Sequence, residues 1–278
     1  MEKIREYTML EVDMPIFFAI LILGVIQGLT EFLPVSSSGH LVFFSKLFGI
    51  EESLFVSIIL HVATLLSIII VLRRQIFYYI KHPLSTGVRK LFVATIPTCL
   101  IVLILLPIIN ASFKGAFLPF CFMLTAFILA FTNLVFAKKK KQILIEGKSE
   151  DFPGISYKQA LLMGVAQGFA VFPGISRSGS TICAGMLSGG DKNSVAEFSF
   201  LMSIPIILLS MCKEIYELIK YDKTLNVDIA GIIIAFILAF IIGVVAIKFM
   251  INLTKRVNFL WFSGYLVVIA FLTLFFVI

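Results

Sequence analysis

The sequence predicts an all-α integral membrane protein with about six transmembrane helices and two re-entrant helix–loop–helix segments in an inverted-topology repeat. Three observations predict this class: 60% of the 278 residues are hydrophobic, apolar stretches of membrane length recur along the chain, and one motif occurs twice, half a chain apart. Soluble globular proteins average about 45–50% apolar residues, so this excess indicates a membrane protein. Because apolar segments continue to the last residue, we expect one integral membrane domain over residues 1–278.

Six segments supply the roughly 20 apolar residues that a helix needs to cross the hydrocarbon core of a bilayer. These predicted spans are Leu54–Leu72, Leu91–Phe113, Ala116–Ala137, Val195–Cys212, Ile229–Ile247 and Phe259–Ile278. Two further apolar segments, Ile16–Ile50 and Ala160–Gly190, are interrupted near the middle by Gly, Pro and Ser. Such a break favours a chain that enters the membrane as a helix, turns, and leaves on the same side as a second helix.

Basic residues in the connections between spans set the direction of the helices. They follow the first, third and fifth spans, at Arg73, Arg74, Lys81, Arg89 and Lys90, at Lys138 to Lys141, and at Lys248, Lys255 and Arg256. These connections are predicted to be cytoplasmic, whereas the 213–228 connection, where acidic residues are at least as numerous as lysines, should lie outside. The net charge of +7 therefore reflects membrane topology and gives no support to nucleic-acid binding.

A repeated motif joins the two interrupted segments. GVIQGLTEFLPVSSSGH (24–40) and GVAQGFAVFPGISRSGS (164–180) align without gaps, with eight identities in seventeen positions at an offset of 140 residues. Each copy is followed by three predicted spans, which gives repeat halves of about 10–140 and 150–278. An odd number of spans inverts the second copy in the membrane, a plan typical of transporters that form a midplane site from broken helices. The alternative is composition bias between Gly/Ser-rich stretches, and the ungapped match at half-length argues against it.

The first copy of the motif concentrates reactive groups at a depth where polar side chains are costly and tend to mark function. Gln27 and Glu31 are four residues apart and share one helix face. A helix that begins at the serines presents free backbone amides, which attract phosphate. Ser36 and Ser37 then lie within one turn of His40. A hydroxyl beside an imidazole, with a carboxylate nearby, has the parts for nucleophilic attack.

The second copy of the motif supplies positive charge. Arg177 lies between Ser176 and Ser178, and Thr181 follows one turn later. A planar guanidinium with hydroxyls and backbone amides is suited to holding a phosphate. If the copies meet at the midplane, they form one asymmetric site for a phosphate ester or anhydride. The alternative for Arg177 and Glu31 is a buried ion pair that locks the loops together, and for any single serine a bond back to its own helix.

These motifs resemble those of the undecaprenyl-diphosphate phosphatases, the bacitracin-resistance family of bacterial inner membranes. QGLTEFLPVSSSGH is similar to the family's (E/Q)xxxE and PVSSxGH elements, FPGISRSGST to its PGxSRSxxT element, and AEFSFLMSIP (196–205) to a further family segment. The resemblance covers essentially the whole chain. It implies hydrolysis of undecaprenyl diphosphate to undecaprenyl phosphate and inorganic phosphate, which recycles the lipid carrier of cell-wall synthesis at a site that opens to the outer face.

By motif position, the resemblance implies that Ser37 is the nucleophile, that His40 is an acid/base, and that Glu31 belongs to the acidic element. The implied diphosphate-binding residues are Arg177, Ser36, Ser176, Ser178, Thr181 and Gln27. A divalent cation, Mg²⁺ or Ca²⁺, is also implied. Because Gln27 stands where other members carry Glu, Glu31 and the substrate's phosphates would hold that cation. The resemblance further implies a homodimer, and small residues such as those in Gly185–Gly190 permit close helix packing.

Two mechanisms and three classes of function are compatible with these residues. Either Ser37 attacks the terminal phosphorus, or water attacks directly while Ser37 positions the substrate. A lipid transporter or flippase would use the same inverted repeat, and a structural membrane scaffold would have no chemistry. Release of phosphate from a long-chain prenyl diphosphate separates these classes, because neither a pure transporter nor a scaffold releases any.

Overall fold

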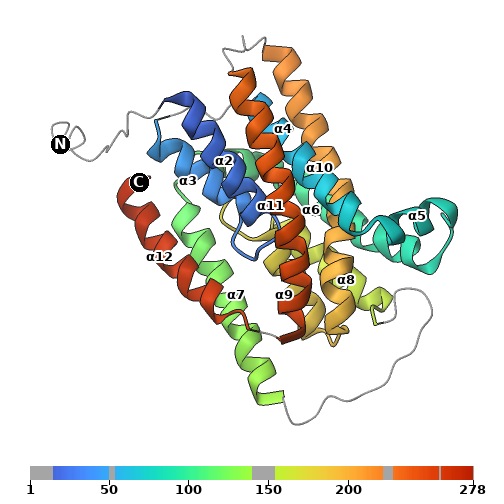
Figure 1. The fold of residues 1–278 in the computed structure, drawn as a ribbon. Coiled ribbons are helices and arrows are strands. Elements are labelled where there is room, and N and C mark those ends of the chain that lie inside the picture. The colour runs from blue at the N-terminus through green and yellow to red at the C-terminus, as the bar shows by residue number, and fades with distance from the viewer. Residues whose placement is uncertain (1–14, 50–53, 140–153, 222–227, 257, 278) are drawn as a thin grey trace.

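The computed structural model describes residues 15–49, 54–139, 154–221, 228–256 and 258–277, whose regular elements are all helices (Figure 1). The helices are α2 (Ile16–Thr30), α3 (Ser37–Leu47), α4 (Leu54–Val71), α5 (Arg73–Lys81), α6 (Thr86–Ser112), α7 (Leu118–Lys139), α8 (Tyr157–Phe169), α9 (Arg177–Leu187), α10 (Lys192–Tyr221), α11 (Ile229–Arg256) and α12 (Leu260–Phe276). The predicted all-α class is confirmed for the part of the chain described.

Five of these helices, α4, α6, α7, α10 and α11, are long and apolar enough to cross a membrane. The sixth predicted span, Phe259–Ile278, forms α12, an apolar helix of 17 residues that is shorter than the other five, and Ile278 lies outside the described residues. The interrupted segments fold as two pairs of shorter helices, α2 with α3 and α8 with α9. The chain is a multi-pass membrane protein.

One helix was not predicted from the sequence. The first basic connection contains α5, and α6 begins at Thr86, five residues before the predicted start of its span. Residues 73–81 read RRQIFYYIK, with polar and basic residues at both ends of an aromatic and aliphatic run, and none of the nine is buried. A short helix of this kind has low average hydropathy, so a search for long apolar stretches misses it. In Figure 1, α5 projects from the side of the helix bundle.

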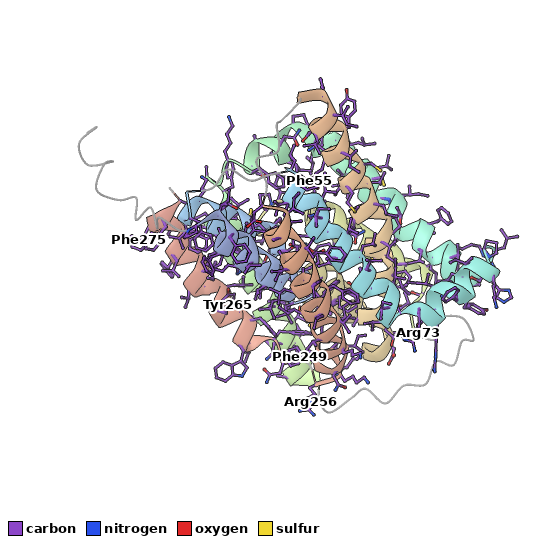
Figure 2. The ribbon with its side chains drawn as sticks, turned by 45° about the horizontal axis from the view of Figure 1, so that its top comes forward. Phe55, Arg73, Phe249, Arg256, Tyr265 and Phe275 are labelled. Carbon is purple, nitrogen blue, oxygen red and sulfur yellow. The ribbon has the colours of Figure 1, made fainter. Side chains whose placement is uncertain are left out.

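The outer faces of the spanning helices are apolar. Ile104 on α6 is 75% exposed and Phe120 on α7 is 70% exposed. Soluble monomers rarely expose contiguous apolar patches larger than a few hundred Å², so faces of this kind are suited to contact lipid. Figure 2 shows Arg73, the first residue of α5, and Arg256, the last residue of α11, toward the end of the bundle opposite Phe55, so these two basic residues lie on the same side. Lys140, Lys141 and residues 222–227 of the other predicted connections lie outside the described residues.

The two halves of the chain make matching contacts. Helix α2 of the first half packs on α11 of the second, and its counterpart α8 packs on α6 of the first half. Two further pairs join equivalent helices of the two halves: α4 contacts its counterpart α10, and α7 lies along its counterpart α12 (Figure 1). Exchanging the halves therefore maps these four contacts onto one another or onto themselves, as expected of a two-fold repeat.

Equivalent glycines permit the closest of these contacts. A Cβ atom added to Gly24 on α2 would clash with the backbone of Ala235 on α11. A Cβ atom added to Gly164 on α8 would clash in the same way with the backbone of Ala94 on α6. Small residues let helix backbones approach each other where lipid supplies no hydrophobic driving force between helices. Gly24 and Gly164 are separated by the repeat offset, so a glycine at the same motif position permits the close helix contact in both halves.

Candidate active site

The turns after α2 and α8, which carry the two copies of the motif, are in direct contact. Ser178 Oγ donates a hydrogen bond to the carbonyl oxygen of Leu33 at 2.9 Å. In the opposite direction, the backbone N–H of Gly174 donates to Ser36 Oγ at 3.1 Å. Ser36 and Ser178 are both buried, so these bonds are shielded from solvent. The two re-entrant turns thus meet tip to tip.

Serines begin both returning helices in the same way. Ser36 Oγ accepts a hydrogen bond from the N–H of Gly39 at 3.3 Å, and Ser176 Oγ accepts one from the N–H of Gly179 at 3.1 Å. An N-cap serine of this kind satisfies one of the free amides in the first turn of a helix. Helices α3 and α9 each begin at the next residue of the motif. The repeat therefore places the first residue of both helices at the point where the turns meet.

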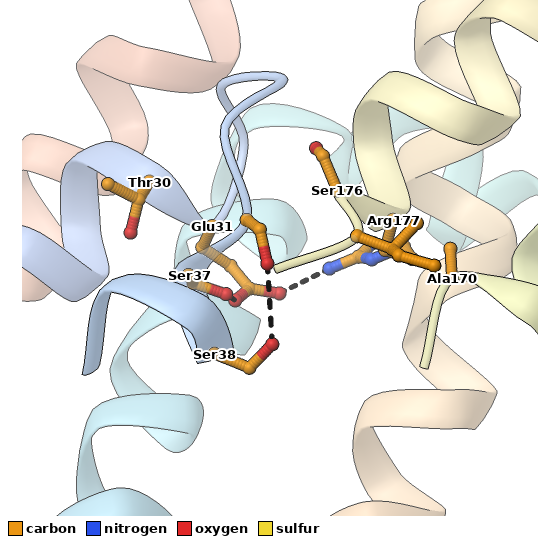
Figure 3. A pocket seen from close by; sticks show the side chains of 9 residues that line it. Thr30, Glu31, Ser37, Ser38, Ala170, Ser176 and Arg177 are labelled. Carbon is orange, nitrogen blue, oxygen red and sulfur yellow. Dashed lines mark hydrogen bonds and ion pairs between the residues drawn. The ribbon is translucent and has the colours of Figure 1, made fainter. Parts of the chain in front are cut away.

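Glu31 is the centre of a hydrogen-bond network between the two turns (Figure 3). Its Oε2 accepts from Ser37 Oγ at 2.5 Å and from Gln27 Nε2 at 3.1 Å, and its Oε1 forms an ion pair with Arg177. The Glu31 side chain is only 6% exposed and that of Arg177 14%. Charges buried to this extent need a partner of opposite sign and hydrogen bonds. Glu31 has both, and it links the two copies of the motif.

These groups border a small pocket of about 40 Å³, a few times the roughly 10–15 Å³ of comparable volume that one water needs. The pocket is lined by Thr30, Glu31, Ser36, Ser37, Ser38, Ala170, Ile175, Ser176 and Arg177. Nη1 of Arg177 is buried and has no hydrogen-bond partner among the described residues. A guanidinium nitrogen can only donate, so Nη1 is available to an anion that enters the pocket.

Five of the predicted site residues line this pocket: Glu31, Ser36, Ser37, Ser176 and Arg177. Gln27 lies behind Glu31 and is fully buried. The hydroxyl groups of two other predicted phosphate ligands form hydrogen bonds within the protein. Ser178 bonds to the opposite turn, and Thr181 Oγ1 donates to the carbonyl oxygen of Arg177 at 2.9 Å and lies 2.6 Å from Ser199 Oγ. In this structure Ser178 and Thr181 shape the start of α9.

Both ring nitrogens of His40 are engaged away from the pocket. Nδ1 lies 2.7 Å from the carbonyl oxygen of Ser36, and Nε2 lies 2.7 Å from the hydroxyl of Tyr265 on α12. A carbonyl oxygen can only accept, which assigns the Nδ1 proton, and in the neutral imidazole Nε2 accepts from Tyr265. His40 is buried and is not among the pocket-lining residues.

Sequence reasoning missed several residues around the site. Thr30 and Ser38 lie beside predicted residues in the motif and could have been found by extending it, whereas Ala170 and Ile175 form an apolar wall without a chemical signal. Tyr265 is different, because it lies 225 residues after His40 in an apolar helix. Nothing in its local sequence marks it as a partner of the motif.

The described part of the chain offers few ligands to a metal ion. Among the described residues, no group of three or more His, Cys, Asp or Glu side chains could hold one. Glu31 provides a carboxylate, and the neighbouring Gln27 has an Oε1 atom that is buried without a hydrogen-bond partner in the described chain. Carboxylate and amide oxygens suit Mg²⁺ and Ca²⁺. These residues fit a cation that takes its remaining ligands from a bound substrate or from water.

Comparison with known proteins gives the chain's relatives. The family model described as "Bacitracin resistance protein BacA" matches residues 20–272. The undecaprenyl-diphosphatase of Parabacteroides distasonis is 36% identical over 270 residues, covering 93% of this chain and 97% of the relative. The undecaprenyl-diphosphatase of Bacteroides fragilis is 37% identical with the same coverage, and that of Carboxydothermus hydrogenoformans is 36% identical over 251 residues, or 89% and 92%. The chain therefore belongs to the BacA family of bacitracin resistance proteins, as its two motifs predicted.

Proposed function

We propose that this protein is an undecaprenyl-diphosphatase of the bacterial cell membrane. It hydrolyses undecaprenyl diphosphate to undecaprenyl phosphate and inorganic phosphate, which recycles the cell-wall lipid carrier and confers resistance to bacitracin. The observation that carries the proposal is the position of Glu31 between the Ser37 hydroxyl and the Arg177 guanidinium at one pocket. The family and the names of the relatives support the substrate.

The proposed nucleophile is Ser37, with Glu31 as its general base. Ser37 Oγ already donates to Glu31 Oε2 at 2.5 Å, within the distance at which a base can take the proton. Oγ forms a bond to the terminal phosphorus, and the bond from that phosphorus to the bridging oxygen breaks. Undecaprenyl phosphate leaves with the bonding electron pair. Water then attacks the phosphoserine, which releases inorganic phosphate and restores the Ser37 hydroxyl.

Arg177 is proposed to neutralise the charge of the transferring phosphoryl group, which is the main task in phosphoryl transfer. Its Nη1 is free to donate while Nη2 still contacts Glu31. When Glu31 accepts the proton of Ser37, its negative charge disappears and its hold on Arg177 weakens. The positive charge of the Arg177 guanidinium is then available to stabilise the negative charge on the transferring phosphoryl group. Hydroxyls of Ser36 and Ser176 complete the phosphate-binding wall.

A divalent cation, Mg²⁺ or Ca²⁺, belongs to the proposal. Glu31 and the free Oε1 of Gln27 would hold it together with the substrate's phosphate oxygens. When bound, such a cation offsets negative charge on the diphosphate.

We further propose that the site faces the outer side of the inner membrane. Its support is the predicted topology, in which the basic connections are cytoplasmic and the first re-entrant segment enters from outside. The exposed apolar faces of the spanning helices would accommodate the prenyl chain, and a second copy of the protein is a further proposed partner.

The test is phosphate release from undecaprenyl diphosphate by protein purified in detergent, with and without EDTA. We expect release by the wild type and its loss by at least about 100-fold in both variants, because Arg177→Ala removes preorganised positive charge at the reacting phosphate and Glu31→Ala removes the general base of Ser37. Arg74→Ala is the control, because Arg74 is exposed on α5 and should leave turnover unchanged. A folded wild-type protein that releases no phosphate would contradict the proposal and favour a lipid transporter.

A further inference from the structure

The backbone of Ser36 is strained. Its φ and ψ angles are 71° and 99°, and it is the only non-glycine residue with positive φ among the described residues. Such a conformation persists only where the surrounding structure holds it, and it concentrates at functional sites. The equivalent residue of the second motif, Ser176, has ordinary angles of −74° and 117°. The strain therefore occurs only in the copy that precedes the proposed nucleophile, Ser37.

Several hydrogen bonds hold Ser36 in this conformation. Its Oγ accepts from the N–H groups of Gly39 and Gly174, and its carbonyl oxygen accepts from the N–H of His40 at 3.2 Å. The His40 ring adds a further bond to the same carbonyl oxygen through Nδ1 at 2.7 Å. The second motif has a serine, Ser180, in place of His40, and its hydroxyl makes no hydrogen bond within the described chain. The hydrogen bond from the imidazole to the preceding backbone and the positive φ angle thus occur in the same copy of the motif.

Tyr265 fixes the other side of the His40 ring. Its hydroxyl lies 2.7 Å from Nε2, and the two rings stack with centroids 5.6 Å apart and planes 7° apart. Phe122 contacts the same imidazole edge-on at 5.2 Å. The partner of one ring nitrogen decides which nitrogen carries the proton. The Ser36 carbonyl requires the proton on Nδ1, and the Tyr265 hydroxyl, by donating to Nε2, fixes the orientation of the ring in that tautomer.

We infer that Tyr265 is a positioning residue for the proposed phosphatase reaction, acting through His40 on the strained backbone of Ser36. Ser37 follows directly in the chain, so a change in the Ser36 backbone would move the Ser37 hydroxyl away from Glu31. Tyr265 itself does not line the pocket. The inference rests on the proposed function, in which Ser37 is the nucleophile, and it gives His40 a task other than acid/base catalysis.

The first test is Tyr265→Phe, which removes only the hydroxyl. We expect kcat for phosphate release to fall about 10- to 100-fold, because small misplacements of a reacting group have effects of this size. KM should stay within about twofold, because Tyr265 touches no pocket group and substrate binding is unaffected. Nitrogen NMR of labelled histidine should show Nε2 of His40 losing its hydrogen bond, as a downfield shift of its resonance, while the proton stays on Nδ1. Tyr216→Phe, at an exposed tyrosine on α10, is the matched control and should change neither quantity.

The second test compares His40→Asn with His40→Ala. The asparagine amide nitrogen can take the place of Nδ1–H and bond to the Ser36 carbonyl, so His40→Asn should retain at least about tenfold more activity than His40→Ala. Adding Tyr265→Phe to His40→Asn should have no further effect, because the two residues act in one chain of contacts. If Tyr265→Phe fails to fold, the comparison of His40→Asn with His40→Ala still tests whether His40 acts by positioning the Ser36 backbone.

The outcomes separate this inference from the proposed function. An active wild type whose Tyr265→Phe variant keeps its kcat would overturn the role of Tyr265 and leave the phosphatase proposal intact. Equal losses in His40→Asn and His40→Ala would also overturn it, because they would indicate that the ring exchanges a proton with the substrate. A wild type without any phosphate release would instead overturn the proposed function itself.

Discussion

Glu31 has two tasks in the proposed reaction, because it accepts from Ser37 with one oxygen and pairs with Arg177 through the other. A buried carboxylate needs hydrogen bonds in addition to its ion pair, so the Ser37 contact is compatible both with the proposed base and with a buried ion pair that locks the two loops together. Phosphate release by variants of Glu31, Ser37 and Arg177 distinguishes the two. The hydroxyl also places Ser37 between its base and the pocket.

Ser37→Ala separates the two mechanisms at the scale of the residue. If Ser37 is the nucleophile, the variant should lose phosphate release by at least about 10³-fold, because nucleophile and base act as a unit. Acid-quenched wild-type protein should carry one phosphoryl group on Ser37, detected by mass measurement of the peptide that contains it. Near-normal turnover by Ser37→Ala would instead show that water attacks directly.

Gln27→Glu tests the proposed cation site. A second carboxylate beside Glu31 should lower the Mg²⁺ concentration needed for half-maximal phosphate release by about tenfold, because ligand charge sets the affinity of oxygen sites. The measurement is a Mg²⁺ titration of EDTA-treated protein. Gln27→Met, which keeps the size but removes the free amide oxygen, should shift the titration the other way. Identical titrations for the wild type and both variants would remove Gln27 from the proposed site.

At the scale of the element, the repeated glycines determine how closely the re-entrant helices approach their partners. Gly24→Ala should destabilise the fold by about 1–3 kcal/mol, because the added methyl group meets the backbone of Ala235. Thermal unfolding in detergent measures the effect. Gly264→Ala on α12 is the matched control, because its added Cβ meets nothing within 4 Å. Equal melting temperatures for Gly24→Ala and the control would show that α2 and α11 are not closely packed in solution.

The sequence predicted most elements because hydropathy and motif position are local signals. The re-entrant pairs were recognisable from the Gly, Pro and Ser that interrupt their apolar runs. The short amphipathic helix α5 was missed because its polar residues lower its average hydropathy. The acid, hydroxyl and guanidinium of the site were predicted because the repeat brought their motifs together. The contact of His40 with Tyr265 could not be predicted, because only the packing of α12 near α3 creates it.

At the scale of the whole molecule, neither half of the repeat contains a complete site. The first half supplies Glu31 and Ser37, and the second supplies Arg177. The exchange of contacts between halves, α2 on α11 and α8 on α6, brings the two turns together. A plan typical of transporters thus places complementary, non-identical groups on either side of one pocket, the arrangement on which the proposed hydrolysis of a charged lipid depends.

The most direct test of this account is a double-mutant cycle of Glu31→Gln and Arg177→Gln, measured as the rate of phosphate release from undecaprenyl diphosphate. Each single variant should lose at least about 100-fold, and the double variant should lose far less than the product of the two, because both residues act in one site. Losses that multiply independently, or single variants that keep normal turnover, would contradict a shared site built from the two halves.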